Sequence, residues 1–497
     1  MRSTIVDYFK EHIKSRHFVY EIETGRRLSF RAVYEKAFGQ TGFFHHAEQK
    51  VIAVILPNSI SYITTFLSVL MTGNIFNPLP YFVEIQELDK IFQYIDPHCI
   101  ITDRKDIFEK YQGRFCVMHP SDSVNPSLGN DQVVDVNMPA CLYYSSGTTG
   151  DPKGILYSHR NMISLISSII RGFKFTSLDR QLALLPFGHT ASINYNILPA
   201  LMVGCDLYIS KGFEHLRSNF FAVLAKYSIT YTEIVPTILF MLCKLNFDLS
   251  SHDLRQLRFI GCGSSTLPLG AQKEFIEKYG IQVANLYGLS ETGPSHIDNP
   301  TEEDWQPGSI GVPLDVNECK IASDGEILIK GDNVFVGYYN NEEAYHNAVK
   351  DGWFHTGDFG AEQNGKFYFL DRKKDLIIKG GINITPSEVE EVIYRHPNVL
   401  ECVVVGRGNP LFGEEIVAVV VPKIKTDLSE SGLVVEILRL CKNNLSNYKI
   451  PVRILIWDEL PKTYSNKILR RKVRDFINAK QEVVTGETPW HQKQLPV

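Results

Sequence analysis

The chain has 497 residues, of which 44% are hydrophobic and 22% are charged, the balance of an ordinary globular protein. A net charge of −5 gives no electrostatic basis for a nucleic-acid partner, and the nine cysteines include no C-x-x-C pair that would indicate zinc or a disulfide framework. No apolar run approaches the ~18 residues of a transmembrane segment, and free thiols in a reducing cytoplasm are expected.

Apolar runs alternate with helix-like segments along the chain. Near the amino terminus, Ile5, Tyr8, Phe9 and Ile13 recur at spacings of three and four, which predicts a helix. Continuous apolar runs that end in turn residues predict buried parallel strands. We expect strands at 51–56, 75–79, 99–102, 140–143, 182–185, 257–260 and 281–283, and helices after 59, over 161–170 and from 236. This alternation predicts an α/β fold with mostly parallel sheets flanked by helices.

A stretch rich in glycine and hydroxyl residues follows the strand expected at 140–143. It runs from Tyr144 to Gly154 and offers the backbone N–H groups, hydroxyls and lysine that bind a polyphosphate. An ordinary surface turn has the same composition, and the spacing is not that of a Walker A loop. The candidate phosphate ligands are Ser145, Ser146, Gly147, Thr148, Thr149, Gly150 and Lys153.

The stretch from Ser145 to Gly154 resembles the phosphate loop of the adenylate-forming superfamily, which includes acyl-CoA synthetases, peptide-synthetase adenylation domains and luciferases. The resemblance covers nearly the whole chain, with several motifs in the same order. One departure is Thr266, which stands where the family usually has proline in the loop along the adenine. The implied contacts are the adenine with Gly263, Ser264, Ser265, Asn285, Leu286, Tyr287 and Gly288, the α-phosphate with Ser290, Mg²⁺ with Glu291, and the ribose with Asp358 and Arg372.

A histidine follows the strand expected at 182–185. A polar residue that caps a loop is the ordinary interpretation, but the resemblance implies that His189 lies beside the acyl pocket. We expect residues 189–196, 232–237 and 261–263 to form that pocket. Residues 188–194 contain no carboxylate that could pair with an ammonium group, so an α-amino acid substrate is disfavoured. A medium-length acyl chain or an aryl acid is compatible with these residues.

A charged run from Asp371 to Asp375 would ordinarily indicate a solvated loop. The resemblance instead divides the chain here, with an ATP- and acid-binding domain over 1–371, a hinge at 372–375 that includes Lys374, a small mobile α+β domain over 376–481 and an unassigned tail at 482–497. It implies that Lys379, Gly380 and Gly381 contact CoA. It also implies that Lys467 reaches the ATP α-phosphate and the substrate carboxylate, although Asn466 replaces the usual glycine. Thr385 and Glu388 fit a capping box at the start of a helix.

The implied reaction has two steps. A carboxylate, which is ionised at neutral pH and needs no general base, attacks the α-phosphorus of Mg·ATP and forms an acyl-adenylate and pyrophosphate. The thiol of CoA then attacks the adenylate carbonyl, and AMP leaves. Mg²⁺ is therefore the expected cofactor, with ATP and CoA as co-substrates. The small domain is expected to swing so that Lys467 and the 379–381 loop act in turn.

The residues leave several alternatives open. A stand-alone adenylating enzyme that loads the phosphopantetheine of a carrier protein would have the same motifs. A regulatory nucleotide-binding protein without turnover would need a broken catalytic set, whereas Lys467, Glu291 and Asp358 are all present. Nothing in the chain indicates a luciferase-type oxidation. The sequence decides neither between a monomer and a homodimer nor which acid is the substrate.

Overall fold

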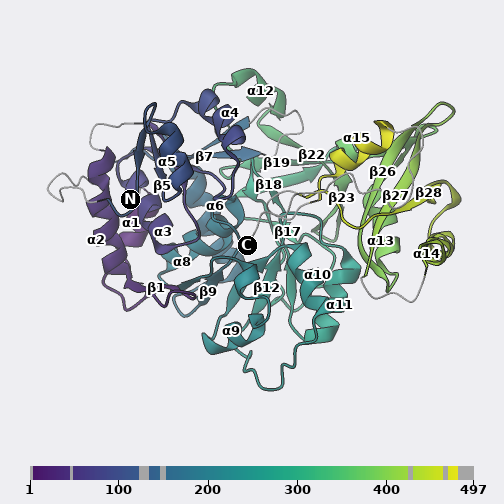
Figure 1. Cartoon of the computed structure of the whole chain (residues 1–497), viewed down its shortest axis with the longest axis horizontal. Coiled ribbons are helices and arrows are strands. Elements are labelled where there is room, and N and C mark those ends of the chain that lie inside the picture. The colour runs from purple at the N-terminus through teal and green to yellow at the C-terminus, as the bar shows by residue number, and fades with distance from the viewer. Residues whose placement is uncertain are drawn as a thin grey trace.

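Two seven-stranded sheets dominate the amino-terminal part of the molecule (Figure 1). The structure is a computed structural model that describes residues 4–44, 49–122, 134–145, 153–423, 429–462 and 468–479. The predicted α/β architecture is confirmed, and strands form at the apolar runs at 51–56, 75–79 and 99–102. The strands predicted at 182–185, 257–260 and 281–283 are each displaced by two residues, to Arg180–Ala183, Phe259–Cys262 and Val283–Asn285.

The first sheet has the order β13-β12-β11-β9-β10-β1-β2, and all neighbours are parallel except β1 and β2. Because β9, β11, β12 and β13 are parallel, their carboxyl ends meet at one edge, where ligands bind in open α/β sheets. The strands are β1 (Phe18–Glu21), β2 (Arg27–Ser29), β9 (Arg180–Ala183), β10 (Asp206–Ile209), β11 (Tyr231–Ile234), β12 (Phe259–Cys262) and β13 (Val283–Asn285).

The second sheet has the order β20-β8-β7-β4-β3-β5-β6. Its inner strands are parallel, whereas β7, β8 and β20 form an antiparallel edge. The strands are β3 (Val51–Ile55), β4 (Ile75–Pro78), β5 (Cys99–Thr102), β6 (Cys116–Met118), β7 (Pro139–Ser145), β8 (Lys153–Ser158) and β20 (Gly337–Tyr338).

Helices pack on both sheets, and the main hydrophobic core lies where residues of both sheets meet helices α3, α6 and α8. In α3 every residue except Ser61 is buried, as expected of a helix that is enclosed on all sides. The helices of this part are α1 (Ile5–Lys10), α2 (Phe30–Gln40), α3 (Ile60–Met71), α4 (Ile85–Ile95), α5 (Lys105–Tyr111), α6 (His159–Phe173), α7 (Thr190–Ser192), α8 (Leu198–Val203), α9 (Phe220–Lys226), α10 (Pro236–Lys244), α11 (Leu269–Tyr279) and α12 (Glu342–Ala348), with the short helices η1 (Thr41–Phe44) and η4 (Phe213–His215) and the π-helix η3 (Ile193–Ile197).

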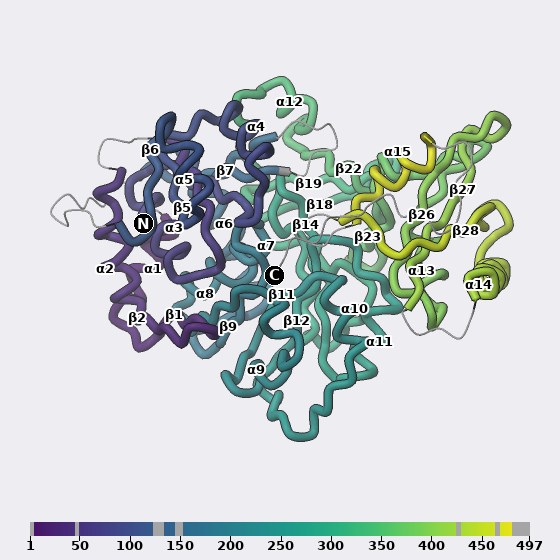
Figure 2. The backbone as a smooth tube through the Cα atoms, in the orientation of Figure 1, coloured from purple at the N-terminus to yellow at the C-terminus, as the bar shows by residue number. Residues whose placement is uncertain are grey.

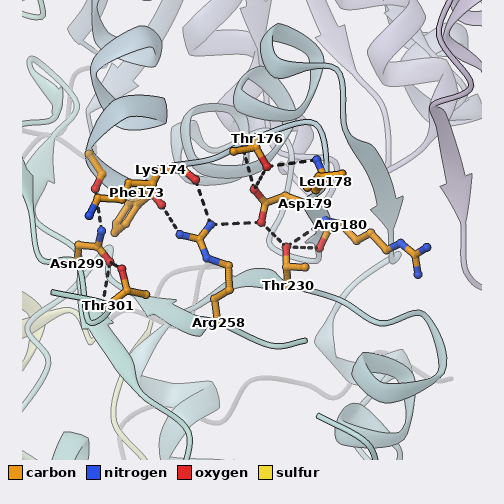
Figure 3. Close-up of polar contacts among 11 residues, drawn as sticks. Phe173, Lys174, Thr176, Leu178, Asp179, Arg180, Thr230, Arg258, Asn299 and Thr301 are labelled. Atoms are coloured by element: carbon orange, nitrogen blue, oxygen red, sulfur yellow. Dashed lines mark hydrogen bonds and ion pairs between the residues drawn. The ribbon is translucent and has the colours of Figure 1, made fainter. Parts of the chain in front are cut away.

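A polar network fixes the amino ends of three strands of the first sheet (Figure 3). Arg258, which immediately precedes β12, donates from Nη2 to the carbonyl oxygen of Phe173 at 2.6 Å, at the end of α6. Its Nη1 lies 3.2 Å from Oδ1 of Asp179, which precedes β9. The same oxygen accepts a 2.7 Å hydrogen bond from the hydroxyl of Thr230, which precedes β11. The network thus sets the relative positions of the strands whose opposite ends carry the predicted site.

Antiparallel strands follow the two parallel sheets. A five-stranded sheet has the order β18-β19-β22-β21, and β23 also pairs with β22. These strands are β18 (Asn317–Ile321), β19 (Glu326–Gly331), β21 (Val349–Lys350), β22 (Trp353–Gln363) and β23 (Lys366–Arg372), and two small hairpins precede them, β14 (Gly288–Leu289) with β15 (Gly293–Pro294) and β16 (His296–Ile297) with β17 (Val312–Pro313).

The carboxyl-terminal part forms a separate sheet with its own core, and Figure 2 shows it at the end of the molecule away from α1 and α2. The sheet has the order β25-β24-β27-β26, and β28 pairs with β27. Its elements are β24 (Ile377–Lys379), β25 (Ile382–Ile384), β26 (Val399–Asn409), β27 (Gly413–Pro422), β28 (Arg453–Ile456), α13 (Pro386–Tyr394), α14 (Glu430–Asn444), α15 (Arg470–Ala479), η5 (Lys373–Asp375) and η6 (Asn447–Lys449).

The capping box predicted at the start of α13 is wrong. Thr385 is the N-cap residue, but its side chain caps no backbone N–H and instead donates to the carboxylate of Glu388 at 3.3 Å. The backbone N–H of Ser387 donates at 2.8 Å to Asp371, a residue of β23. A carboxylate from the preceding sheet therefore takes the capping role that the local sequence pattern assigns to Thr385.

All nine cysteines are free thiols, and seven of them are buried, which agrees with the expectation of free thiols. In the described part of the chain, none of the helices combines the length and apolar character that crossing a bilayer requires.

Candidate active site

Three predicted nucleotide-binding residues come together beside the carboxyl end of β13. The hydroxyl of Tyr287 donates to Oδ2 of Asp358 at 2.9 Å, and Nε of Arg372 lies 3.4 Å from Oδ1 of the same carboxylate. Asp358 and Arg372 are also opposite each other in the pairing of β22 with β23. Asp358 is only 2% exposed, and burial together with this carboxylate raises the pKa of the Tyr287 phenol. The arrangement orients the buried Asp358 carboxylate.

A second cluster surrounds Glu291. The hydroxyl of Tyr338 in β20 donates to Oε1 of Glu291 at 3.1 Å, and Nζ of Lys153 lies 5.7 Å from the centroid of the Tyr338 ring. Burial raises the pKa of Glu291, whereas the positive charges of Arg372 and Lys153 act in the opposite direction. Ser290, the preceding residue, is held through its carbonyl oxygen, which accepts a 3.0 Å hydrogen bond from the Tyr157 hydroxyl.

The predicted adenine segments approach each other closely. Leu286 donates its N–H to the carbonyl oxygen of Cys262, and a Cβ added at Gly263 would meet Cβ of Leu286 at 2.7 Å and its carbonyl oxygen at 2.8 Å. Ser264 adopts a φ of +66°, which is rare for residues other than glycine. This Ser264 is exposed and the neighbouring Ser265 is half-buried, so the loop presents backbone and small side chains to solvent.

Two further predicted residues flank Tyr287 and hold its loop in place. The N–H of Asn285 donates at 2.8 Å to Asp298, and its side-chain amide donates at 3.1 Å to the carbonyl oxygen of Ser309. Gly288 lies so close to β15 that an added Cβ would meet the carbonyl oxygen of Gly293 at 2.2 Å. The loop therefore tolerates no side chain at position 288.

His189 lies at the amino end of α7, immediately before the π-helix η3. Its Nδ1 accepts a 3.3 Å hydrogen bond from the N–H of Ala191, so the ring caps this short helix. His189 therefore acts as a capping residue, as the ordinary interpretation expects, and its position beside an acyl pocket stays a prediction. Gly188 packs against the main chain of residues 79 and 80, and an added Cβ would lie 2.6 Å from Cα of Pro80.

In the carboxyl-terminal sheet, Lys379, Gly380 and Gly381 form the tight turn between β24 and β25. Both glycines have positive φ, +59° and +81°, as a two-residue hairpin turn requires. Nζ of Lys379 donates to the carbonyl oxygen of Tyr448 at 3.0 Å. Burial and the charge of Arg372 lower the pKa of Lys374.

The segment after Lys467 is tied to the hinge region. Arg470, the first residue of α15, donates from Nη2 to Oε2 of Glu390 in α13 at 3.0 Å, and its Nε lies 3.8 Å from Asp375. Arg474 donates to the carbonyl oxygen of Lys374 at 3.2 Å.

Several predicted ligands lie outside the described residues, namely Ser146, Gly147, Thr148, Thr149, Gly150 and Lys467. The ends of the predicted phosphate loop are described, because Ser145 closes β7 and pairs with Lys153 at the start of β8. Likewise, Lys462 and Ile468 form an antiparallel bridge that flanks position 467.

The profile of the AMP-binding enzyme family matches residues 9–339, and that of the AMP-binding enzyme C-terminal domain matches residues 388–467. The chain belongs to the AMP-binding enzyme family. Its resemblance to adenylate-forming enzymes is thereby confirmed.

Similar proteins of this family are CoA ligases. The probable CoA ligase CCL9 of Humulus lupulus is 30% identical over 470 residues, which are 88% of this chain and 88% of the relative. The 2-succinylbenzoate–CoA ligase of Bacillus mycoides is 30% identical over 479 residues, or 92% of this chain and 95% of the relative. The structure of o-succinylbenzoate CoA synthetase (MenE) from Bacillus subtilis with its acyl-adenylate intermediate superimposes with a TM-score of 0.84 and 26% identity, and covers 98% of this chain and 99% of that one.

Two polar residues were not singled out by the motifs, although the second lies within the predicted pocket segment 232–237. Tyr338, which contacts Glu291, lies in a Gly-Tyr-Tyr segment that reads as an ordinary turn. Glu233 is a carboxylate inside an apolar strand, two residues before the Val235-Pro236 step into α10. A charged residue in the middle of such a strand is the signal that could have identified it.

Proposed function

We propose that this AMP-binding enzyme is an AMP-forming carboxylic acid:CoA ligase. The observation that carries the proposal is the convergence of Tyr287, Asp358 and Arg372 with Glu291 beside the carboxyl ends of the parallel strands. Full-length similarity to CoA ligases supports the same reaction.

In the first half-reaction, the acid and ATP are held so that the carboxylate oxygen faces the α-phosphorus. Asp358 accepts hydrogen bonds from the ribose hydroxyls, and Tyr287 and Arg372 keep its carboxylate oriented. Residues 145–150 and Lys153 bind the phosphates, and Ser290 donates to the α-phosphate. Lys467 approaches the same phosphate and offsets the negative charge that grows in the transition state.

Glu291 is the residue that would hold Mg²⁺. Its half-buried carboxylate has a raised pKa because of partial burial, so a nearby cation would favour its charged form. Among the described residues, no group of three or more His, Cys, Asp or Glu side chains could hold a metal ion by itself. When bound, Mg²⁺ supplies charge neutralisation to the triphosphate.

In the second half-reaction, the thiol of CoA attacks the acyl-adenylate and AMP leaves. Lys379, Gly380 and Gly381 contact CoA, and the protein mainly positions the thiol and excludes water. Movement of the 376–481 domain about residues 372–375 brings this turn to the site in place of Lys467. CoA is favoured over a carrier protein because the similar proteins are named CoA ligases. A cytoplasmic location fits the nine free thiols.

Pyrophosphate release from ATP with a panel of carboxylic acids tests the first step. Glu291→Gln should lower the rate at least about 100-fold, the scale of losing one charge-stabilising group. Glu362→Gln, which changes an exposed carboxylate of β22, should leave it unaltered. Absence of pyrophosphate release with every acid would refute the proposal.

The second step is tested by thioester formation. The wild-type protein should form thioesters faster with free CoA than with a phosphopantetheinylated carrier, and the reverse order would favour the carrier alternative. Lys467→Ala should abolish ATP–pyrophosphate exchange but largely spare thioester formation from supplied acyl-adenylate. Equal loss of both activities would contradict the alternation of the small domain.

A further inference from the structure

A carboxyl group without any hydrogen-bond partner lies in the middle of the first sheet. Glu233 in β11 is 1% exposed, and neither of its carboxyl oxygens has a partner. Burial raises its pKa well above the usual value, and no cation offsets this effect among the described residues. A buried carboxyl without a partner is strongly destabilising, so its retention calls for a role.

Other polar groups without partners lie in β11 itself and in the neighbouring π-helix η3. Asn196 in the π-helix η3 is fully buried, and neither its amide oxygen nor its amide nitrogen has a partner. The hydroxyl of Tyr231, on the same face of β11 as Glu233, is also unpaired. Glu233 acts electrostatically on both Tyr231 and Tyr195, which places the phenols close to its carboxyl group.

Glu233 and Asn196 come from two of the three segments that the sequence assigned to the acyl pocket, and the third segment pairs with the strand of Glu233. Asn196 belongs to residues 189–196 and Glu233 to residues 232–237. Gly261 of residues 261–263 lies opposite Glu233 in the pairing of β11 with β12. An added Cβ at Gly261 would lie 2.6 Å from the Tyr231 hydroxyl, so this phenol occupies the space beside the register partner of Glu233.

The backbone around Asn196 is specialised in a way that supports a ligand site. A π-turn frees main-chain carbonyls and is frequent at functional sites. With its amide nitrogen facing η3, the buried side chain of Gln181 donates to the carbonyl oxygens of Asn196 and Tyr195 at 3.0 and 3.2 Å. Gln181 thus satisfies the backbone of η3, while the Asn196 side chain stays without a partner.

We propose that Glu233 and Asn196 bind a hydrogen-bond-donating group, either a hydroxyl or an ammonium, on the acyl part of the acid substrate. This inference rests on the proposed ligase function and names its substrate class. An acid with a plain hydrocarbon chain would leave these buried polar groups unpaired. An enzyme rejects a substrate that lacks such a hydrogen-bonding group far more strongly than one that lacks a methylene group. On this proposal the carboxylate that residues 188–194 lack comes from β11, so the reason for disfavouring an α-amino acid does not extend to an amino group on the acyl part.

The test compares acids that differ only in the donor. Pyrophosphate release is measured with benzoate, its hydroxy derivatives and 4-(aminomethyl)benzoate, and with hexanoate, 6-hydroxyhexanoate and 6-aminohexanoate. For the wild-type protein, kcat/KM should favour the best donor-bearing acid over its parent at least about 100-fold. Glu233→Met should reduce this ratio to below about 5-fold. Each ratio is taken on one protein sample, so partial loss of folded enzyme does not change it.

Two further variants sharpen the comparison. Glu233→Gln should retain activity with the hydroxyl-bearing acids but lose it with the amine-bearing acids, because a neutral amide does not form an ion pair with an ammonium group. This variant therefore distinguishes a hydroxyl donor from an ammonium donor. Thr102→Val removes a similar buried hydrogen bond, from the Thr102 hydroxyl to the carbonyl oxygen of Ile55 at 2.9 Å, in β5 of the other large sheet, and should leave the ratio unchanged.

The outcomes separate this inference from the proposed function. Pyrophosphate release that is equal or faster with the parent acids, or the same ratio in Glu233→Met as in the wild type, would show that the carboxyl is satisfied by buried water and would overturn the inference alone. If Glu233→Met does not fold, the test is the thermal stabilisation of the wild-type protein by two acyl-sulfamoyl adenosines that differ only in a hydrogen-bond donor on the acyl group. Equal stabilisation by the two compounds would overturn the inference. No release with any acid would overturn both.

Discussion

Replacement of Arg258 by methionine tests how the first sheet holds the site. Methionine keeps an apolar stem but removes the guanidinium group that donates to Phe173 and pairs with Asp179 (Figure 3). Asp179 would keep its hydrogen bonds from the Thr230 hydroxyl at 2.7 Å and from the N–H of Thr176 at 2.7 Å. Its charge would remain buried without a cation, since its side chain is 5% exposed.

The expected loss follows from this geometry. Removing one partner of a buried ion pair costs about 3–5 kcal/mol, and the lower end applies because the Arg258 side chain is 25% exposed. An unfolding entropy of about 2.1 cal/mol/K per residue over roughly 370 residues gives about 0.8 kcal/mol/K. The melting temperature of the amino-terminal part should therefore fall by about 4 °C.

Differential scanning calorimetry at a fixed scan rate measures this shift. Adding Asp179→Asn to Arg258→Met should recover more than half of the loss, because the stranded charge is then removed. Arg255→Met is the matched control: Arg255 pairs with Asp253 at 2.7 Å, but its side chain is 87% exposed, so the change should stay within about 0.5 kcal/mol. A decrease in melting temperature of less than about 1 °C for Arg258→Met, or no recovery of the melting temperature in the double variant, would refute the reasoning.

Three further predictions concern other described residues. Burial lowers the pKa of His159 to about 4, and neither ring nitrogen has a partner, so the protein loses stability as pH falls from about 6.5 through about 4. His159→Leu should remove up to about 3 kcal/mol of this loss, measured by thermal melts over that pH range. The same dependence of melting temperature on pH in the variant and the wild type would contradict this. Gly263→Ala should raise the KM for ATP about 10-fold or more in pyrophosphate exchange, because its Cβ would meet a neighbour at 2.7 Å, whereas Gly270→Ala, with nothing within 4 Å, should not. Tyr287→Phe removes the donor to Asp358 and should raise the KM for ATP about 10-fold while the KM for the acid stays within about 2-fold; parallel changes in both would indicate general damage.

Several strands and their order along the chain could be predicted because they are largely apolar runs that end in turn residues. Val51–Ile55, Ile75–Pro78 and Cys99–Thr102 form within a residue of where the pattern indicates. The cap of α13 could not be predicted, because Asp371 reaches it from another sheet and displaces the local Thr385–Glu388 pattern.

The same distinction applies to the site. Tyr287, Asp358 and Arg372 belong to local motifs, and the structure brings them into contact. Tyr338 lies 47 residues from Glu291 and meets it only because β20 joins the edge of the second sheet. Local patterns do not encode such contacts, which depend on the register of distant strands. The individual ligand assignments stay predictions until nucleotide binding is measured.

The contacts of Arg470 bear on how a movement of the hinge would be transmitted to Lys467, the proposed catalytic lysine. Its guanidinium joins Glu390 in α13 to Asp375 within the predicted hinge, three residues beyond Lys467. The chain just after the lysine is therefore anchored both to the body of the small domain and to its pivot. A rotation about residues 372–375 would therefore be transmitted to the lysine over only a few residues. Weakening the contacts of Arg470 with Glu390 and Asp375 should slow adenylation without altering any group that touches ATP.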